Sequence, residues 1–174
     1  MSEDEKKILL SLASNTIAKS LGLPFEEIDA SSYKEMRGAF VTLKKKGHLR
    51  GCIGYIIAIK PLYKQIADLS LEAAYQDPRF PKLKKEEFPF IDIEISILSV
   101  PKEIKDLSEF QLSRDGIFLI VGSNRSVFLP QVADETGWSK EELLRALSQK
   151  AGLYPDEYKR EYAKYLTFTA EVFS

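Results

Sequence analysis

One alternating stretch constrains the fold of this chain more than any other. From Ile91 to Leu98 every second residue is isoleucine, and the residues between are mostly polar. Because successive side chains of a strand point to opposite faces, this pattern predicts a strand with one buried and one largely polar face. Pro101 ends the predicted strand.

Helices are predicted before and after this strand in the sequence. Residues Glu3–Leu21 carry an apolar stripe at spacings of three and four, and Gly22 and then Pro24 stop the helix. Pro61 opens a second helix, which is expected to end near residue 75. A capping box that starts at Ser139 opens a third helix, which closes at Gly152.

The remaining apolar runs are short and separated by turn signals. Residues 39–43 and 48–53 are expected to form a hairpin, as are 117–121 and 127–129, and residues 165–173 a single last strand. Residues 82–87 are interpreted as a charged, solvated connector. Hairpin-linked strands interspersed with a few helices predict an α+β fold with a mainly antiparallel sheet flanked by helices, in a single domain over residues 1–174.

The segment Gly47–Gly54 is the main candidate for a functional site, since it holds the only cysteine and the only histidine of the chain. A three-residue loop, Lys45–Gly47, would pair Leu43 with Leu49 and keep one side of the hairpin apolar. This register places Cys52 on the same face as Arg50 and His48.

Cys52 is the candidate catalytic residue. A neighbouring cation favours the thiolate, the reactive form of cysteine, and Arg50 would supply that cation. His48 lies two steps along the same strand face, roughly 13 Å away, so it is too distant for a direct hydrogen bond to the thiol. A small cysteine packed between glycines is the structural alternative.

Glu94 and Arg50 form a second constellation, because each lies on the polar side of its predicted strand. The two side chains would pair or jointly line a cleft, and Glu94 would orient Arg50 or move a proton. A plain salt bridge across strands is the alternative. Gly51 and Gly54 frame Cys52 and mark places where a backbone or a ligand approaches closely.

Three further residues are candidate binding groups. Asp77 and Arg79 lie in a stretch stiffened by Pro78 and Pro81, which would hold an exposed side chain in place; the alternative is that Asp77 caps a turn and pairs with Arg79. Gln131 follows Pro130 and would point its amide into a groove, or else only begin a helix.

Composition excludes several classes of protein. One cysteine and one histidine exclude a disulfide framework and a Cys-rich zinc site, so no metal site is predicted, and the cofactor stays unknown. A formal net charge of −1 gives no global argument for nucleic acid, although residues Lys44–Lys46 form a local basic run. An acidic start and the free thiol favour a cytoplasmic protein away from membranes.

The stretch Leu49-Arg50-Gly51-Cys52-Ile53-Gly54 resembles the signature of the AMMECR domain family, called AmmeMemoRadiSam system protein A in prokaryotes. The similarity extends over nearly the whole chain through further motifs in the same order: Gly38–Thr42, Asp77–Phe80, Glu94–Ser96, Phe128–Val132, Gly137-Trp138 and Lys150–Leu153. One departure is visible, since many members carry a cysteine where this chain has Ser148.

The resemblance implies a two-lobed α+β fold with a larger and a smaller lobe and a cleft near the signature. It also implies Memo-type and radical-SAM-type proteins as partners, but no settled activity. The first hypothesis is an enzyme or enzyme-system component with an unknown small-molecule or modified-residue substrate in a cleft lined by Arg50, Cys52 and Glu94. The alternatives are a non-catalytic interaction partner and a nucleic-acid-binding regulator.

Overall fold

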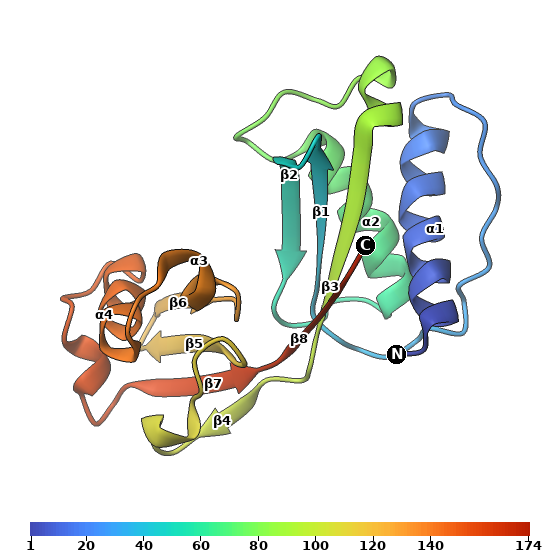
Figure 1. Ribbon diagram of the computed structural model, residues 1–174. Helices are drawn as coiled ribbons and strands as arrows, with labels where there is room; N and C mark the ends of the chain where they lie inside the picture. The colour runs from blue at the N-terminus through green and yellow to red at the C-terminus, as the bar shows by residue number, and fades with distance from the viewer. The chain divides into compact units, whose positions relative to one another are not determined.

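The computed structural model describes residues 1–174 and shows an α+β fold, as predicted (Figure 1). The chain forms two compact units: unit 1 comprises Met1–Leu98 and Glu171–Ser174, and unit 2 comprises Ser99–Ala170. Each unit contains one four-stranded sheet.

Unit 1 is built on a sheet with the strand order β2-β1-β3-β8. Its elements are α1 (Glu3–Ser20), β1 (Ala39–Lys45), β2 (His48–Tyr55), α2 (Leu62–Tyr75), the 3-10 helix η1 (Lys85–Phe90), β3 (Ile91–Leu98) and β8 (Ala170–Phe173). The central strands β1 and β3 pair antiparallel over their full overlap.

Unit 2 has a sheet with the order β4-β7-β5-β6. Its elements are β4 (Lys102–Ile104), η2 (Leu107–Glu109), β5 (Gly116–Val121), β6 (Asn124–Phe128), α3 (Val132–Thr136), α4 (Lys140–Lys150), η3 (Glu157–Lys159) and β7 (Lys164–Phe168). Helix α4 begins at the predicted cap, because the Ser139 side chain accepts a hydrogen bond from the Glu142 backbone N–H.

The core of unit 1 lies between its sheet and the two long helices. Val41 and Leu43 of β1 and Ile95 of β3 are fully buried with the apolar stripes of α1 and α2. Figure 1 shows α1 and α2 alongside this sheet. The isoleucine alternation thus gives β3 a core side, as predicted, and an opposite side that carries Glu94.

The register of the β1–β2 hairpin differs from the prediction. The turn has two residues, Lys46 and Gly47, both with positive φ, and a bulge lies opposite the Leu43/Lys44 step. Arg50 is the extra residue of that bulge, since Lys44 pairs with Leu49 and Leu43 with Gly51. After a two-residue turn, a strictly alternating β2 would set Arg50 opposite the buried Leu43. The extra residue shifts the register by one, so that Gly51 and Ile53 pair with Leu43 and Val41 on the apolar face.

Two further expectations need correction, one of them only in part. The last strand is not one element: Thr169 separates β7 from β8, and these two strands belong to different sheets. The charged stretch 82–87 is solvated only in part: Lys82, Lys84, Lys85 and Glu86 are exposed, but residues from Lys85 on belong to η1, and the side chain of Glu87 is largely buried.

Candidate functional site

The candidate site lies on the side of the unit 1 sheet opposite to the α1–α2 core, here called the outer face. Thr42 of β1 pairs with Cys52 on one side and with Glu94 on the other. Directly paired residues of adjacent strands point to the same face, so these three side chains form one row, here called the polar row. The structure therefore brings together the two predicted catalytic residues and adds Thr42 between them.

The Cys52 thiol is half-buried and hydrogen-bonded. The hydroxyl of Thr42 donates to the Cys52 sulfur at 3.1 Å. The backbone N–H of Cys52 donates to Asp77 Oδ2 at 2.9 Å, and Arg79 Nη2 donates to the Cys52 carbonyl oxygen at 3.5 Å. Because β2 is an edge strand, Asp77 and Arg79 take the place of a neighbouring strand and fix the backbone at the cysteine.

Asp77 is buried and highly connected. Besides the Cys52 N–H, it accepts the Arg79 backbone N–H at 3.0 Å and two guanidinium bonds at 2.9 and 2.7 Å. These hydrogen bonds, led by the one from the Arg79 side chain, hold the pKa of Asp77 well below its usual range despite the opposing effect of burial. Arg79 is the cation near Cys52, and its own side chain is 56% exposed. Asp77 therefore caps a turn and pairs with Arg79, as the alternative interpretation predicted, and the two residues also contact the Cys52 backbone.

Arg50 lies elsewhere than predicted. Its Nε and Nη2 donate to the Glu87 carboxylate at 3.1 and 2.9 Å, forming a bidentate pair. Lys45, which follows Leu43 on the core-side alternation of β1, also donates to Glu87. The expected Arg50–Glu94 pairing is therefore wrong, and so is the common face of Arg50 and Cys52, because the bulge turns Arg50 away from the outer face.

The Arg50–Glu87 contact, here called the buried pair, is largely shielded from water. Arg50 is only 7% exposed, and its Nη1 atom has no hydrogen-bond partner. The hydrogen bonds from Arg50, helped by Lys45 and the Lys84 backbone, lower the pKa of Glu87 to about 2. Glu87 was missed in the sequence because a run of charges resembles a solvated loop.

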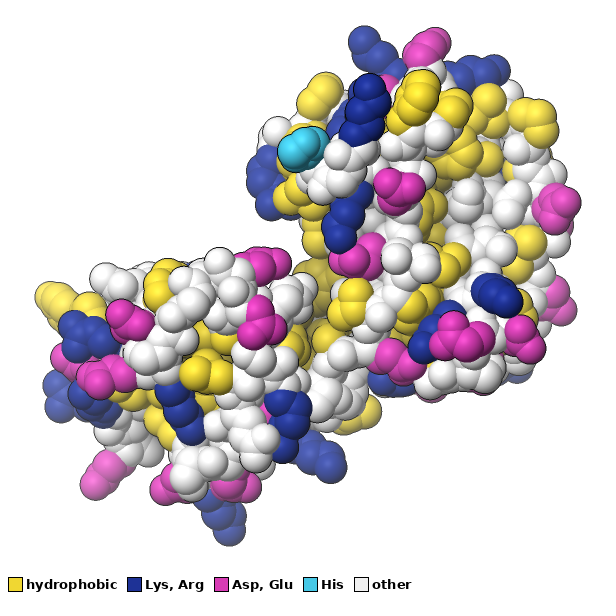
Figure 2. Space-filling model, viewed as in Figure 1, with side chains coloured by type: hydrophobic (Ala, Val, Ile, Leu, Met, Phe, Trp, Pro, Cys, Tyr) yellow, Lys and Arg dark blue, Asp and Glu magenta, His cyan; other side chains and the backbone are white.

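Glu94 pairs with Lys44 at 2.8 Å, and both side chains are partly exposed. This contact is here called the outer pair. Lys45 is engaged with Glu87, and Lys46 lies over the Phe90 ring at 5.8 Å. Lys and Arg side chains gather around the β1–β2 turn in Figure 2, but two of the three consecutive lysines are held in ion pairs, Lys45 sharing the single charge of Glu87 with Arg50. The geometry therefore gives little support to nucleic-acid binding.

The two predicted binding glycines have packing roles. A Cβ on Gly51 would stand 2.2 Å from the Ala73 carbonyl oxygen of α2, so the missing side chain lets β2 lie against that helix. A Cβ on Gly54 would overlap the Phe40 ring at 2.2 Å. Ligand contact by either glycine stays a prediction.

Unit 2 holds Gln131 and Ser148. Gln131 begins α3 without a side-chain cap, and its carbonyl accepts the Glu135 N–H. Ser148 is fully buried, and its hydroxyl accepts the Tyr158 backbone N–H at 3.1 Å. The residue where related sequences carry a cysteine is thus a core position in this chain, which argues against a reactive group there.

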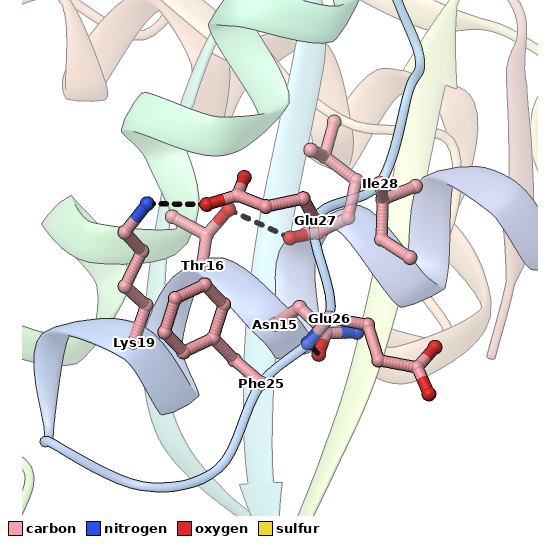
Figure 3. Close-up of a pocket in the computed structure, with 8 residues that line it drawn as sticks. Asn15, Thr16, Lys19, Phe25, Glu26, Glu27 and Ile28 are labelled. Atoms are coloured by element: carbon pink, nitrogen blue, oxygen red, sulfur yellow. Dashed lines mark hydrogen bonds and ion pairs between the residues drawn. The ribbon is translucent and has the colours of Figure 1, made fainter.

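A small hollow of about 50 Å³ lies beside α1 and is lined by apolar side chains and by polar groups, most of which are already paired (Figure 3). Lys19 pairs with Glu27 and lies over the Phe25 ring, and Asn15 accepts the Glu26 backbone N–H. These contacts fasten the segment after α1 to that helix, so we interpret the hollow as structural. The structure groups no three His, Cys, Asp or Glu side chains as a metal site, and none of its helices has the length and apolarity to cross a bilayer.

Comparison with other proteins places the chain in a family. A sequence profile described as AMMECR1 matches residues 10–173. A protein of Methanothermobacter thermautotrophicus is 38% identical over 99% of this chain and 95% of its own length, and one of Pyrococcus furiosus is 39% identical over 86% and 76%.

A crystal structure of an uncharacterised protein from Pyrococcus horikoshii has the same fold. It superposes with a TM-score of 0.85 at 32% identity, over 99% of this chain and 92% of the other. The predicted resemblance is therefore confirmed: the chain belongs to the AMMECR1 family.

Proposed function

We propose that this protein is a component of an enzyme system and binds a small-molecule or modified-residue ligand at the polar row. Memo-type and radical-SAM-type proteins are the proposed partners, and the cytoplasm the proposed location. The observation that carries the proposal is the alignment of Cys52, Thr42 and Glu94 across three adjacent strands. Strands about 4.8 Å apart present a thiol, a hydroxyl and a carboxylate at a spacing that suits one ligand lying across them.

The fixed backbone of Cys52 supports this proposal. Asp77 and Arg79 hold its N–H and carbonyl, so the thiol points from a rigid edge strand rather than from a mobile loop. Rigid supporting contacts are what a binding residue needs in order to keep its geometry. Gly51 packs the same strand against α2 and adds to that rigidity.

Catalysis by Cys52 is the second candidate, and a specific contact favours it. The Thr42 hydroxyl donates to the sulfur, and the Arg79 guanidinium lies beside the same residue. The Thr42 hydrogen bond would stabilise negative charge on the sulfur as it reacts. Arg79, whose charge is shared with Asp77, is the cation beside Cys52 in place of Arg50, and Glu94, two strands away, would contact the ligand.

Alkylation tests the thiol directly, because Cys52 is the only cysteine and any iodoacetamide adduct reports on it alone. Rates measured by mass spectrometry at pH 7 are expected to fall severalfold in Thr42→Val and Arg79→Gln relative to the unchanged protein. Arg125→Gln, in unit 2, is the matched control and is expected to leave the rate unchanged. Equal rates in all four proteins would remove thiol activation.

Co-purification separates the two candidates. If the polar row is a docking or ligand site, Glu94→Gln and Thr42→Val weaken binding to the Memo-type or radical-SAM-type partner, and Cys52→Ser retains the cellular phenotype. If Cys52 is catalytic, Cys52→Ser keeps partner binding and loses the phenotype. Partner binding and phenotype that survive all three substitutions would contradict the proposal.

A further inference from the structure

Strand β8 covers only part of the free edge of β3. The Ser99 backbone N–H donates to the Thr169 carbonyl oxygen, which fixes the antiparallel register of the two segments. Continued along the strands, that register places Phe173, the last residue of β8, beside Ile95. Residues 91–93 of β3 therefore have β1 on one side and no strand on the other, and Figure 1 shows β3 extending past the end of β8.

The unpaired backbone groups of this edge can be named. Leu98 N–H donates to Gly38 on the β1 side, whereas Ser99 N–H donates to the β8 side, so odd-numbered residues of β3 face the open edge. The Ile91 N–H is already used by the Phe88 carbonyl. This leaves the N–H and C=O of Ile93 and the C=O of Ile91 without a strand partner.

A hollow of about 380 Å³ lies along the same edge. It is lined by Leu10 and Ser14 of α1, by Ser174, and by the three β3 residues Ile91, Asp92 and Ile93. The isoleucines continue the core-side alternation of β3, and Asp92 points to the outer face. Asp92 is exposed and makes no ion pair, since the opposing Lys44 is bonded to Glu94.

We propose that this open edge, residues 91–93, binds an extended segment of a partner protein in which a basic residue is flanked by two apolar residues. The segment adds a strand in line with β8. Its backbone pairs with Ile93 and Ile91, and its apolar side chains enter the hollow beside Leu10. The basic side chain lies on the outer face next to Asp92.

Two arguments select this occupant. Among peptide conformations, an extended backbone pairs with both the free N–H and the free C=O of one edge residue, and alternation of its side chains then separates an apolar from a polar face. A second copy of the chain fits poorly, because antiparallel self-pairing centred here would set Asp92 against the Asp92 of that copy, and like charges directly opposite are destabilising. A basic residue complements the unpaired carboxylate.

The probe is a blocked peptide, Ser-Val-Lys-Val-Thr, titrated into isotope-labelled protein. The Ile93 amide resonance is expected to shift on titration and its hydrogen exchange to slow by about tenfold at saturation. Asp92→Lys is expected to weaken binding of this peptide about threefold to fivefold and to strengthen binding of Ser-Val-Glu-Val-Thr. Asp92 is exposed and unpaired, so this charge reversal is expected to leave the fold intact.

A fused strand removes the dependence on a weak free peptide. Val-Lys-Val added directly after Ser174 aligns with residues 93, 92 and 91 in the β8 register and is expected to protect the Ile93 amide, whereas Pro-Lys-Pro is not. Absence of protection in the fusion, or equal binding of the two peptides before and after Asp92→Lys, would overturn the proposal. Self-association through Ile93 would assign the edge to a second copy and overturn it too.

Cys52→Ala separates this inference from the proposed function. Cys52 lies on β2, which β1 separates from the open edge on β3, so this substitution is expected to leave the peptide affinity unchanged. A Cys52→Ala protein that lost peptide binding would show that the two features are one site, which would contradict the inference as stated.

Discussion

Two acid–base pairs lie near the β1–β2 hairpin of unit 1, and their surroundings are opposite. The buried pair, Arg50 with Glu87, has side chains 9% and 18% exposed, while the outer pair, Lys44 with Glu94, has side chains 37% and 26% exposed. Removing one partner of the buried pair leaves an uncompensated charge and destabilises the fold strongly, whereas the outer pair is screened by solvent and contributes little to stability. The first therefore fixes the hairpin, and the second stays available to a ligand.

Glu87→Gln gives the largest expected effect. The substitution leaves the Arg50 charge buried without its counter-charge, and removing one member of a buried pair typically costs about 3–5 kcal/mol. The free energy of unfolding in urea is expected to fall by that amount. Glu86→Gln, on the exposed neighbour in η1, is the control and is expected to change it by less than about 0.5 kcal/mol. A loss below about 1 kcal/mol would show that the pair is not buried in solution.

Replacing both members sharpens the same contrast. Arg50→Met combined with Glu87→Leu removes both charges and keeps apolar volume, and such exchanges are often neutral or stabilising. The double variant is expected to be more stable than Glu87→Gln alone. If it were less stable, the hydrogen bonds of the pair, including the one from Lys45 to Glu87, would outweigh the cost of burying charge.

Acid gives the next effect. The pKa of Glu87 is lowered from its ordinary value of 4.5 to about 2. Its contribution to stability is therefore complete above pH 4.5 and is lost as the pH falls toward 2, by up to about 3 kcal/mol. Urea unfolding at pH 6, 4 and 2.5 is expected to show this loss, and Glu87→Gln to show a smaller slope. Identical slopes would place the acid sensitivity in other carboxylates.

The sequence predicted much of this arrangement, and its failures have physical causes. The isoleucine alternation and the helix caps are local signals, and they predicted β3, α1 and α4 almost to the residue. The bulge at Arg50 has no local sequence signal, because it depends on combining a two-residue turn with the burial of one face of β1. Without it, Arg50 was placed with Cys52 and Glu94.

The residues of the site were likewise predicted where local signals placed them and missed where tertiary contacts did. Cys52 and Glu94 do share the outer face, because both lie in regular stretches of strand. Glu87 was missed, because no periodicity distinguishes a carboxylate that reaches a buried arginine from one that faces water. The sequence predicted that Asp77 and Arg79 lie in a rigid loop. It did not predict their hydrogen bonds to the Cys52 backbone, because these form only where β2 is an edge strand.

Asp77→Asn is expected to have an effect between those of the two pairs, because the Asp77 side chain is 2% exposed and that of its partner Arg79 is 56% exposed. Hydrogen bonds to a charged group contribute about 1.5–3 kcal/mol, and asparagine keeps only part of this acceptor set. The free energy of unfolding is expected to fall by about 2 kcal/mol. Faster exchange of the Cys52 amide, measured by mass spectrometry or NMR, is the accompanying sign that the edge strand has been released. An unchanged amide would assign the loss to the loop alone.

Glu94→Gln is expected to have the smallest effect on stability, because its partner Lys44 is partly exposed and such pairs contribute about 0–1 kcal/mol. Salt sharpens the test: 1 M salt screens exposed charges, so the difference between Glu94→Gln and the unchanged protein is expected to vanish there, whereas the effect of Glu87→Gln persists. A Glu94→Gln loss as large as that of Glu87→Gln would break the comparison. Glu94 would then be a structural residue like Glu87, and the polar row would lose the acid that makes it a ligand site.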